Sequence, residues 1–72
     1  MEEIFIYTDF VTLGQFLKLA NLIQTGGEAK EFLSNHEILV DGELDNRRGR
    51  KLYDGMVISL LNKKFVIKKK WS

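Results

Sequence analysis

The fold is decided by residues 12–60, which read TLGQFLKLANLIQTGGEAKEFLSNHEILVDGELDNRRGRKLYDGMVISL. At the start of this stretch, apolar residues recur at the spacing of one helix face, which predicts a helix over residues 13–22. Thr12 and Gln15 have the spacing of a capping box, in which each side chain bonds a backbone N–H group of the first turn. The first helix is therefore expected to begin directly after Thr12.

A second helix is expected to begin at Thr25-Gly26-Gly27-Glu28, with Thr25 as its cap. The two glycines allow the chain to reverse sharply, and Thr25 and Glu28 repeat the spacing of a capping box. The apolar stripe of this second segment ends at His36, which is expected to finish the helix at the edge of the core. The two segments together predict an αα-hairpin of short amphipathic helices.

The sequence on both sides of the helices is typical of short strands. Residues 4–8 are β-branched or aromatic and predict an edge strand. After the helices, the pattern predicts strands over residues 38–40, 43–44, 52–53, 56–61 and 64–67, with turns at 41–42, 54–55 and 62–63 and a polar loop over 46–51. The expected fold class is α+β: a single small domain in which the αα-hairpin packs on a short-stranded, mostly antiparallel β-sheet.

The length and charge of the chain limit its function. Its 72 residues suffice for one domain with a single core and leave little for a deep active-site cleft. The net charge is only +1, but residues 1–45 carry nine acidic and two basic residues (net −7), whereas residues 46–72 carry nine basic residues and one acidic residue (net +8). Such a concentration of positive charge commonly binds phosphate.

Several classes of function are excluded by what the sequence lacks. It has no Cys and one His, so neither a disulfide nor a zinc site is expected. It shows no signal peptide and no apolar run of about 20 residues, so a cytoplasmic location without membrane contact is expected. Although His36 adjoins Glu37, no Ser or Cys is arranged around it as a nucleophile. We therefore expect no catalytic residue, metal, cofactor or small-molecule substrate.

Residues 12–60 resemble the small RNA-binding domain named after ribosomal small-subunit protein four, the αL RNA-binding motif. The resemblance is carried by the Leu-rich first helix, Ala29-Lys30, Val40-Asp41-Gly42, and Asp54-Gly55 followed by an apolar strand. Because TGGEAK and NRRGRK occur together, the chain looks most like the stand-alone YaaA-type branch. This resemblance implies a non-enzymatic domain over residues 1–72, with the motif core at 12–60 and a basic tail at 68–72, that binds ribosomal RNA and acts at the ribosome or in its assembly.

The expected RNA-binding residues lie in two segments. Arginine offers phosphate a planar fork of donors, and the exposed N–H groups at a helix start also suit an anion. Many family members have Ser-Arg where this chain has Thr25-Gly26, so the N–H groups there would replace a missing cation. The predicted contacts are Thr25, Gly26, Gly27, Lys30, Asn46, Arg47, Arg48, Arg50 and Lys51.

Two questions stay open at this stage. Lys63, Lys64, Lys68, Lys69 and Lys70 could extend the RNA-binding face or guard an edge strand against unwanted pairing. The chain could also be a protein-interaction module that uses its separate acidic and basic surfaces.

A monomer is expected. Trp71 is expected to pack over the open end of the sheet, and the other aromatic residues are expected in the core or at its rim, namely Phe5, Tyr7, Phe10, Tyr53 and Phe65.

Overall fold

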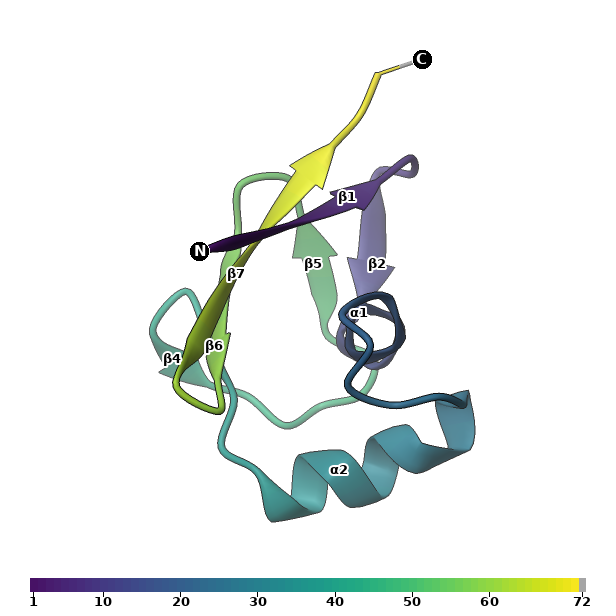
Figure 1. Cartoon of the computed structure of the whole chain (residues 1–72), viewed down its shortest axis with the longest axis vertical. Helices are drawn as coiled ribbons and strands as arrows, with labels where there is room; N and C mark the ends of the chain where they lie inside the picture. Colours follow the sequence, from purple (N-terminus) through teal and green to yellow (C-terminus); the bar gives the residue numbers. More distant parts are fainter. Residues whose placement is uncertain (72) are drawn as a thin grey trace.

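The computed structural model describes residues 1–71 (Figure 1). Two helices and seven strands follow one another, with a short 3₁₀ helix, η1, between the helices. Their bounds are β1 (Glu2–Ile6), β2 (Phe10–Thr12), α1 (Leu13–Leu19), η1 (Gly26–Glu28), α2 (Ala29–Asn35), β3 (Leu39–Val40), β4 (Glu43–Leu44), β5 (Lys51–Tyr53), β6 (Val57–Leu60) and β7 (Lys63–Lys69). Of the expected basic tail 68–72, Lys68 and Lys69 belong to β7, and Ser72 lies outside the described residues.

The strands form two sheets. The larger has the order β1-β7-β6-β3-β4, and the smaller pairs β2 with β5. Every pairing is antiparallel except that of β1 with β7. Figure 1 shows α1 end-on beside the sheets and α2 lying across below it, so the axes of the two helices cross. The predicted α+β class, with an αα-hairpin on a mostly antiparallel sheet, is confirmed, and β1 lies at the predicted edge.

The first predicted capping box is present. The N–H of Gln15 donates to Thr12 Oγ1 at 3.2 Å, and the N–H of Thr12 donates to Gln15 Oε1 at 2.8 Å. The helix that it starts is shorter than predicted, because it ends at Leu19 rather than residue 22. Asn21 adopts a positive φ of 64°, and the N–H of Leu22 then returns to the carbonyl of Leu17 at 2.9 Å. An asparagine in this left-handed conformation is a common helix terminator.

The second predicted capping box was wrong. Thr25 makes no capping bond to a backbone N–H group; its hydroxyl donates instead to Glu28 Oε1 at 3.4 Å. The other Glu28 oxygen accepts the N–H of Gln24 at 3.2 Å rather than that of Thr25. The physical reason is that residues 26–28 form a 3₁₀ turn, so Glu28 itself has helical φ and ψ and precedes α2.

Two hairpin turns fix the register of the larger sheet. Asp41 and Gly42 have φ of 50° and 86°, as predicted for a two-residue turn. The Asp41 carboxylate also accepts the N–H of Val57 at 2.8 Å, which ties this turn to β6. The second turn falls at Leu61-Asn62, with φ of 52° and 61°, one residue before the predicted position, because Lys63 already pairs with Leu60.

One apolar core joins the helices to both sheets. Phe16 of α1 and Phe65 of β7 are almost completely buried and meet edge to face, with ring centroids 5.3 Å apart. The remaining buried apolar side chains are Ile4, Ile6, Val11, Leu13, Leu17, Ile23, Ala29, Leu33, Ile38, Val40, Leu52, Ile58, Leu60 and Ile67. His36 finishes α2 at the core edge as expected, stacked on Phe32 with its Nδ1 2.9 Å from the Phe32 carbonyl oxygen.

Three of the five aromatic residues that were expected in the core or at its rim contradict that expectation. Phe5, Tyr7 and Tyr53 are exposed, whereas Phe65 is fully buried and Phe10 is partly buried. Trp71 does not cover the sheet, since its side chain is 81% exposed. The exposure of Phe5 follows from the alternation of side chains along β1. Ile4 and Ile6 point into the core, so Phe5 points to the opposite face of the strand. Within residues 1–71, no helix is long and apolar enough to cross a membrane.

Candidate nucleic-acid interface

Residues 46–51, which comprise the loop 46–50 and the first residue of β5 and are called the arginine loop below, are attached to the start of α1 by their backbone. The N–H of Leu13 donates to the carbonyl of Arg50 at 2.7 Å, and the N–H of Gly14 donates to the carbonyl of Arg48 at 3.0 Å. With Thr12 accepting the N–H of Gln15, the first three amides of the helix all have acceptors. The arginine loop is therefore part of the helix cap and not a free surface loop.

Gly14 makes the close approach of the loop possible. A Cβ atom at this position would lie 2.8 Å from Arg48 Cγ and 3.6 Å from Ala29 Cβ. The aliphatic part of Arg48 thus crosses Gly14 beside the first residue of α2. Gly14 was not predicted as a site residue. The signal in the sequence was a glycine in the first turn of a predicted helix. Glycine has a low helix propensity, so its presence there indicates close packing by another segment.

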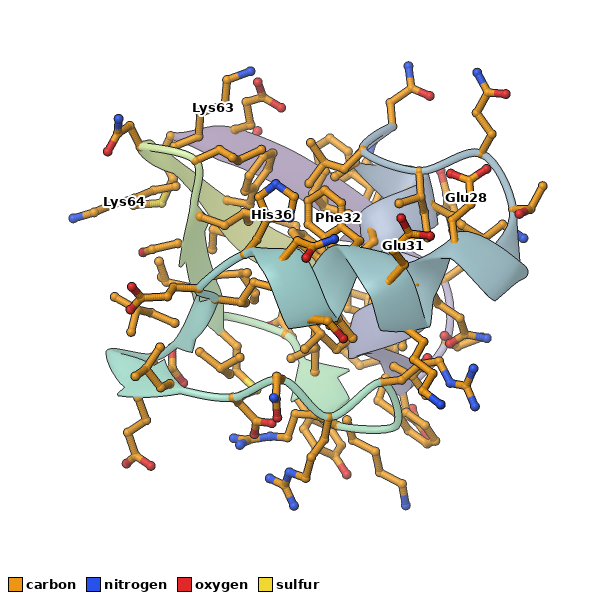
Figure 2. All side chains as sticks on the ribbon, turned by 90° about the horizontal axis from the view of Figure 1, so that it is seen from below. Glu28, Glu31, Phe32, His36, Lys63 and Lys64 are labelled. Carbon is orange, nitrogen blue, oxygen red and sulfur yellow. The ribbon has the colours of Figure 1, made fainter. Side chains whose placement is uncertain are left out.

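The arginine loop runs along α2. Asn46 lines an open hollow of about 420 Å³ with the last residues of α2, and Arg48 lies beside its first residue, Ala29. Figure 2 shows Glu28 and Glu31 on one side of α2 and the pale green loop on the other. The acidic side of the helix is thus turned away from the arginine loop.

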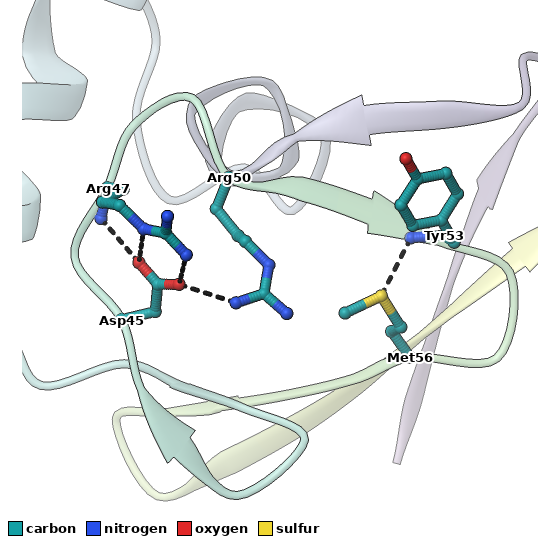
Figure 3. A network of polar contacts seen from close by, with 5 residues as sticks. All are labelled: Asp45, Arg47, Arg50, Tyr53 and Met56. Carbon is teal, nitrogen blue, oxygen red and sulfur yellow. Dashed lines mark hydrogen bonds and ion pairs between the residues drawn. The ribbon is translucent and has the colours of Figure 1, made fainter.

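Asp45 binds two of the loop cations (Figure 3). Its Oδ1 accepts the backbone N–H and the Nε–H of Arg47 at 2.9 and 3.1 Å, and its Oδ2 accepts one N–H from each of Arg47 and Arg50, both at 2.8 Å. The side chain of Asp45 is only 6% exposed. The hydrogen bonds from Arg47 hold the pKa of this carboxyl well below its usual value, and Asp45 in turn raises the pKa of Arg47.

Asp45 was missed as part of the site. The sequence signal was an acidic residue directly before a run of bases, and the structure makes it the centre of the loop. Arg47 and Arg50 share one carboxylate, whereas Arg48 and Lys51 make no ion pair with any residue of the described chain. Within the arginine loop, Arg48 and Lys51 are therefore the cations most available to an external anion.

The acidic and basic halves of the sequence do not form separate halves of the molecule. Each ion pair among residues 1–71 joins an acid from residues 1–45 to a base from residues 46–71. Besides the two pairs of Asp45, Glu3 lies 3.9 Å from Lys68 and Asp9 lies 2.6 Å from Lys69. Because several bases of residues 46–71 are paired with acidic residues, the surface with unpaired positive charge is smaller than the charge sums indicate. We infer that it centres on the arginine loop.

The start of α2 holds the second predicted segment. Thr25, Gly26, Gly27 and Lys30 are all exposed, and a Cβ atom on Gly26 would meet no atom within 4 Å. The Glu28 carboxylate already accepts bonds from Gln24 and Thr25 at this place. Because that negative charge opposes an anion, the arginine loop is the stronger half of the site.

The outer side of the arginine loop faces an open hollow of about 440 Å³. Its lining consists of Arg47, Gly49, Arg50, Lys51, Tyr53 and Met56. Figure 3 shows how Met56 lies under Tyr53, with the Tyr53 N–H donating to Met56 Sδ at 3.1 Å. The arrangement combines guanidinium donors with an exposed aromatic ring, and both kinds of group suit a nucleic acid. Among residues 1–71 no group of His and acidic side chains is placed to hold a metal ion.

Replacing Asp45 tests how the loop is held. Asp45→Asn keeps the shape of the side chain but removes its charge. Because the hydrogen bonds from Arg47 and Arg50 then lose their charge assistance, we expect the free energy of unfolding to fall by about 1–2 kcal/mol at neutral pH. Because the pKa of Asp45 is lowered by folding, its contribution is fully present above about pH 5 and is lost as the pH falls through the lowered value.

Urea unfolding at several pH values measures this effect. The wild-type protein should lose stability on acidification more steeply than Asp45→Asn, and the two should converge at low pH. Glu43→Gln is the matched control, because it removes the same charge from an exposed side chain two residues away. If Asp45→Asn is as stable as Glu43→Gln at neutral pH, the Asp45 contacts do not stabilise the fold.

Two comparisons with known proteins give matches over most of the chain. The family model of the S4 domain matches residues 4–68, from within β1 to within β7. Over 55 residues the chain is 66% identical to a protein of Bacillus subtilis (strain 168) named probable ribosome maturation protein RlbA. That match covers 76% of this chain and 78% of the relative.

Proposed function

Since the chain belongs to the S4 domain family of non-enzymatic RNA-binding modules, we propose that it binds structured ribosomal RNA and acts in ribosome maturation. The name of the B. subtilis relative refers to ribosome maturation, and the identity between the two chains supports extending that role. We propose further that the protein acts as a monomer in the cytoplasm, where ribosomes mature.

The observation that carries this proposal is the attachment of the arginine loop to α1. Two backbone hydrogen bonds and the Asp45 contacts hold the loop in one place before any ligand arrives. A site whose groups are already ordered loses less conformational entropy on binding. Arg48 and Lys51, both exposed and without ion-pair partners among residues 1–71, are thus held ready for phosphate.

The site is proposed to contact two backbone segments of a folded RNA. Arg48 and Lys51 would make the main phosphate contacts, while Arg47, Arg50 and Asn46 would complete the arginine loop segment. Thr25, Gly26, Gly27 and Lys30 would hold the second segment, because Arg48 packs beside Ala29 at the start of α2. Contacts of this kind recognise the shape of RNA and read little base sequence.

The salt dependence of binding tests the mechanism. If roughly 4 to 6 phosphates are engaged, the slope of log K against log salt should be about −3 to −5. The measurement is fluorescence anisotropy of a labelled RNA hairpin titrated with the protein at several salt concentrations. A slope near zero would exclude phosphate contact as the source of affinity.

The identity of the RNA is tested by crosslinking in cells. We expect sequencing of the crosslinked RNA to recover one segment of ribosomal RNA. Diffuse recovery over many RNAs would contradict a role in ribosome maturation while leaving RNA binding intact. A protein-interaction module would be favoured instead if crosslinking recovers no RNA and a pull-down from a nuclease-treated lysate still recovers a protein partner.

A further inference from the structure

A second exposed surface adjoins the arginine loop and is built from aromatic rings and lysines. We call it the aromatic strip and define it as Phe10, Tyr53 and Trp71 together with Lys51 and Lys69. The rings of Phe10 and Tyr53 meet across the β2–β5 pair with centroids 5.8 Å apart. Lys51 Nζ lies 4.9 Å from the centroid of Phe10, and Lys69 Nζ lies 4.1 Å from that of Trp71.

A chain of contacts connects the two ends of the strip. Phe10 follows Asp9, whose carboxylate binds Lys69 Nζ at 2.6 Å, and the same ammonium lies against the Trp71 ring. The Lys69 side chain is only 16% exposed, so it fixes the position of the indole more than it offers charge to solvent. One face of Trp71 thus rests on Lys69, and the ring as a whole stays open to solvent.

The exposure of these rings is not explained by packing. In a domain of 72 residues, apolar side chains are needed inside, yet Trp71 is 81% exposed and Tyr53 is 47% exposed. Exposed aromatic residues that lie together indicate a binding surface more than scattered ones do. Two open hollows flank Phe10 and Tyr53: the one of about 440 Å³ along the arginine loop, and one of about 1000 Å³ between Phe10 and the outer side of α1.

The strip is continuous with the proposed phosphate site. Lys51 belongs to both, because it ends the arginine loop and also lies over Phe10. A strand of RNA held by Arg48 and Lys51 would therefore have aromatic rings directly beside its backbone. An unpaired nucleotide presents a phosphate and a flat base together, and this surface presents lysine and aromatic ring together.

We propose that the aromatic strip stacks unpaired bases of RNA that flank the structured segment bound by the arginine loop. The proposal rests on the proposed function, since it presupposes RNA on the neighbouring site. Unpaired RNA fits the strip better than a protein segment does, because the exposed Lys51, which has no ion-pair partner among residues 1–71, lies against the Phe10 ring, and a cation beside aromatic rings matches a phosphate beside its base. The rings accept any base, so this contact adds affinity without demanding a sequence.

The test compares two RNA hairpins of the same stem, one blunt and one with a single-stranded tail of roughly six adenosines. The wild-type protein should bind the tailed hairpin about tenfold more tightly than the blunt one. Trp71 is the only tryptophan of the chain, so its own fluorescence reports base stacking. We expect the tailed hairpin to quench this fluorescence and the blunt hairpin to leave it nearly unchanged.

Variants assign the effect to the strip. Trp71→Ala should remove most of the advantage of the tail, and Trp71→Phe should keep part of it because a ring remains. Since Trp71 is exposed, neither change should disturb folding. Leu61→Ala, at an exposed apolar residue of the β6–β7 turn, is the matched control and should bind both hairpins like the wild type.

The outcomes separate this proposal from the proposed function. If the protein binds both hairpins equally and Trp71 is not quenched, base stacking is overturned while RNA binding stands. If it binds neither hairpin, both proposals fall. If the tail increases affinity equally in Trp71→Ala and wild type, the tail acts through the phosphates alone and the strip is not a base-stacking surface.

Discussion

Arg48→Glu combined with Lys51→Glu should lower the affinity for a structured RNA by about 100-fold or more. Each lost charge-assisted contact is worth on the order of tenfold in affinity, and each new carboxylate adds repulsion. Both side chains are exposed and make no ion pair within residues 1–71, so the change removes available cations. Binding is measured by fluorescence anisotropy with an RNA hairpin, and the fold is checked by circular dichroism.

Lys63→Glu combined with Lys64→Glu is the matched control for this prediction. It changes the net charge by the same amount at two exposed lysines at the start of β7. Figure 2 shows these lysines beyond the His36 end of α2, on the opposite side from Glu28. We expect the control to lose little affinity. An equal loss in both double variants would mean that RNA senses only the total charge and that the arginine loop is not the site.

Phe16→Ala should lower the free energy of unfolding by about 3–5 kcal/mol. The ring is completely buried and meets Phe65 of β7 edge to face, so its removal leaves a cavity between α1 and the larger sheet. For a domain of this size, such a loss lowers Tm by on the order of 15–30 °C. Thermal unfolding followed by circular dichroism measures it.

Phe5→Ala makes the same chemical change at a ring that is 42% exposed on β1. We expect a loss below about 1 kcal/mol, because little apolar area is recovered by solvent when a half-exposed ring is removed. If Phe5→Ala destabilises the protein as strongly as Phe16→Ala, the core does not lie between α1 and the larger sheet.

Several elements that depend on neighbouring residues were predicted correctly from the sequence, although the capping box of Thr25 and Glu28 was not among them. The capping box of Thr12 and Gln15, the apolar face of α1 and the Asp41-Gly42 turn are all confirmed, since their bonds join residues close in the chain. The S4 resemblance, carried by the same local motifs, is confirmed by the family match. The predicted RNA contacts themselves stay a prediction.

The elements that depend on distant residues were missed or misplaced. Strand β2 went unpredicted because it has only three residues and runs directly into the cap of α1, and its pairing partner β5 is far along the chain. The aromatic residues were expected in the core or at its rim because the chain is short, whereas the structure fills the core around Phe16 and Phe65 with aliphatic residues and leaves Tyr7, Tyr53 and Trp71 exposed. Which side of a strand faces the core depends on its register, and only pairing sets that register.

By itself, the sequence determined where the first helix begins, where the first hairpin turns and which loop concentrates the arginines, because spacing and local hydrogen bonding specify these features. Only the tertiary structure decided which cations are available. In the folded protein, the carbonyls of Arg48 and Arg50 accept hydrogen bonds from the first backbone N–H groups of α1. Asp45 forms ion pairs with Arg47 and Arg50. Arg48 and Lys51 were left free of ion pairs within the described chain, because charges are neutralised by neighbours in space and not by totals along the sequence.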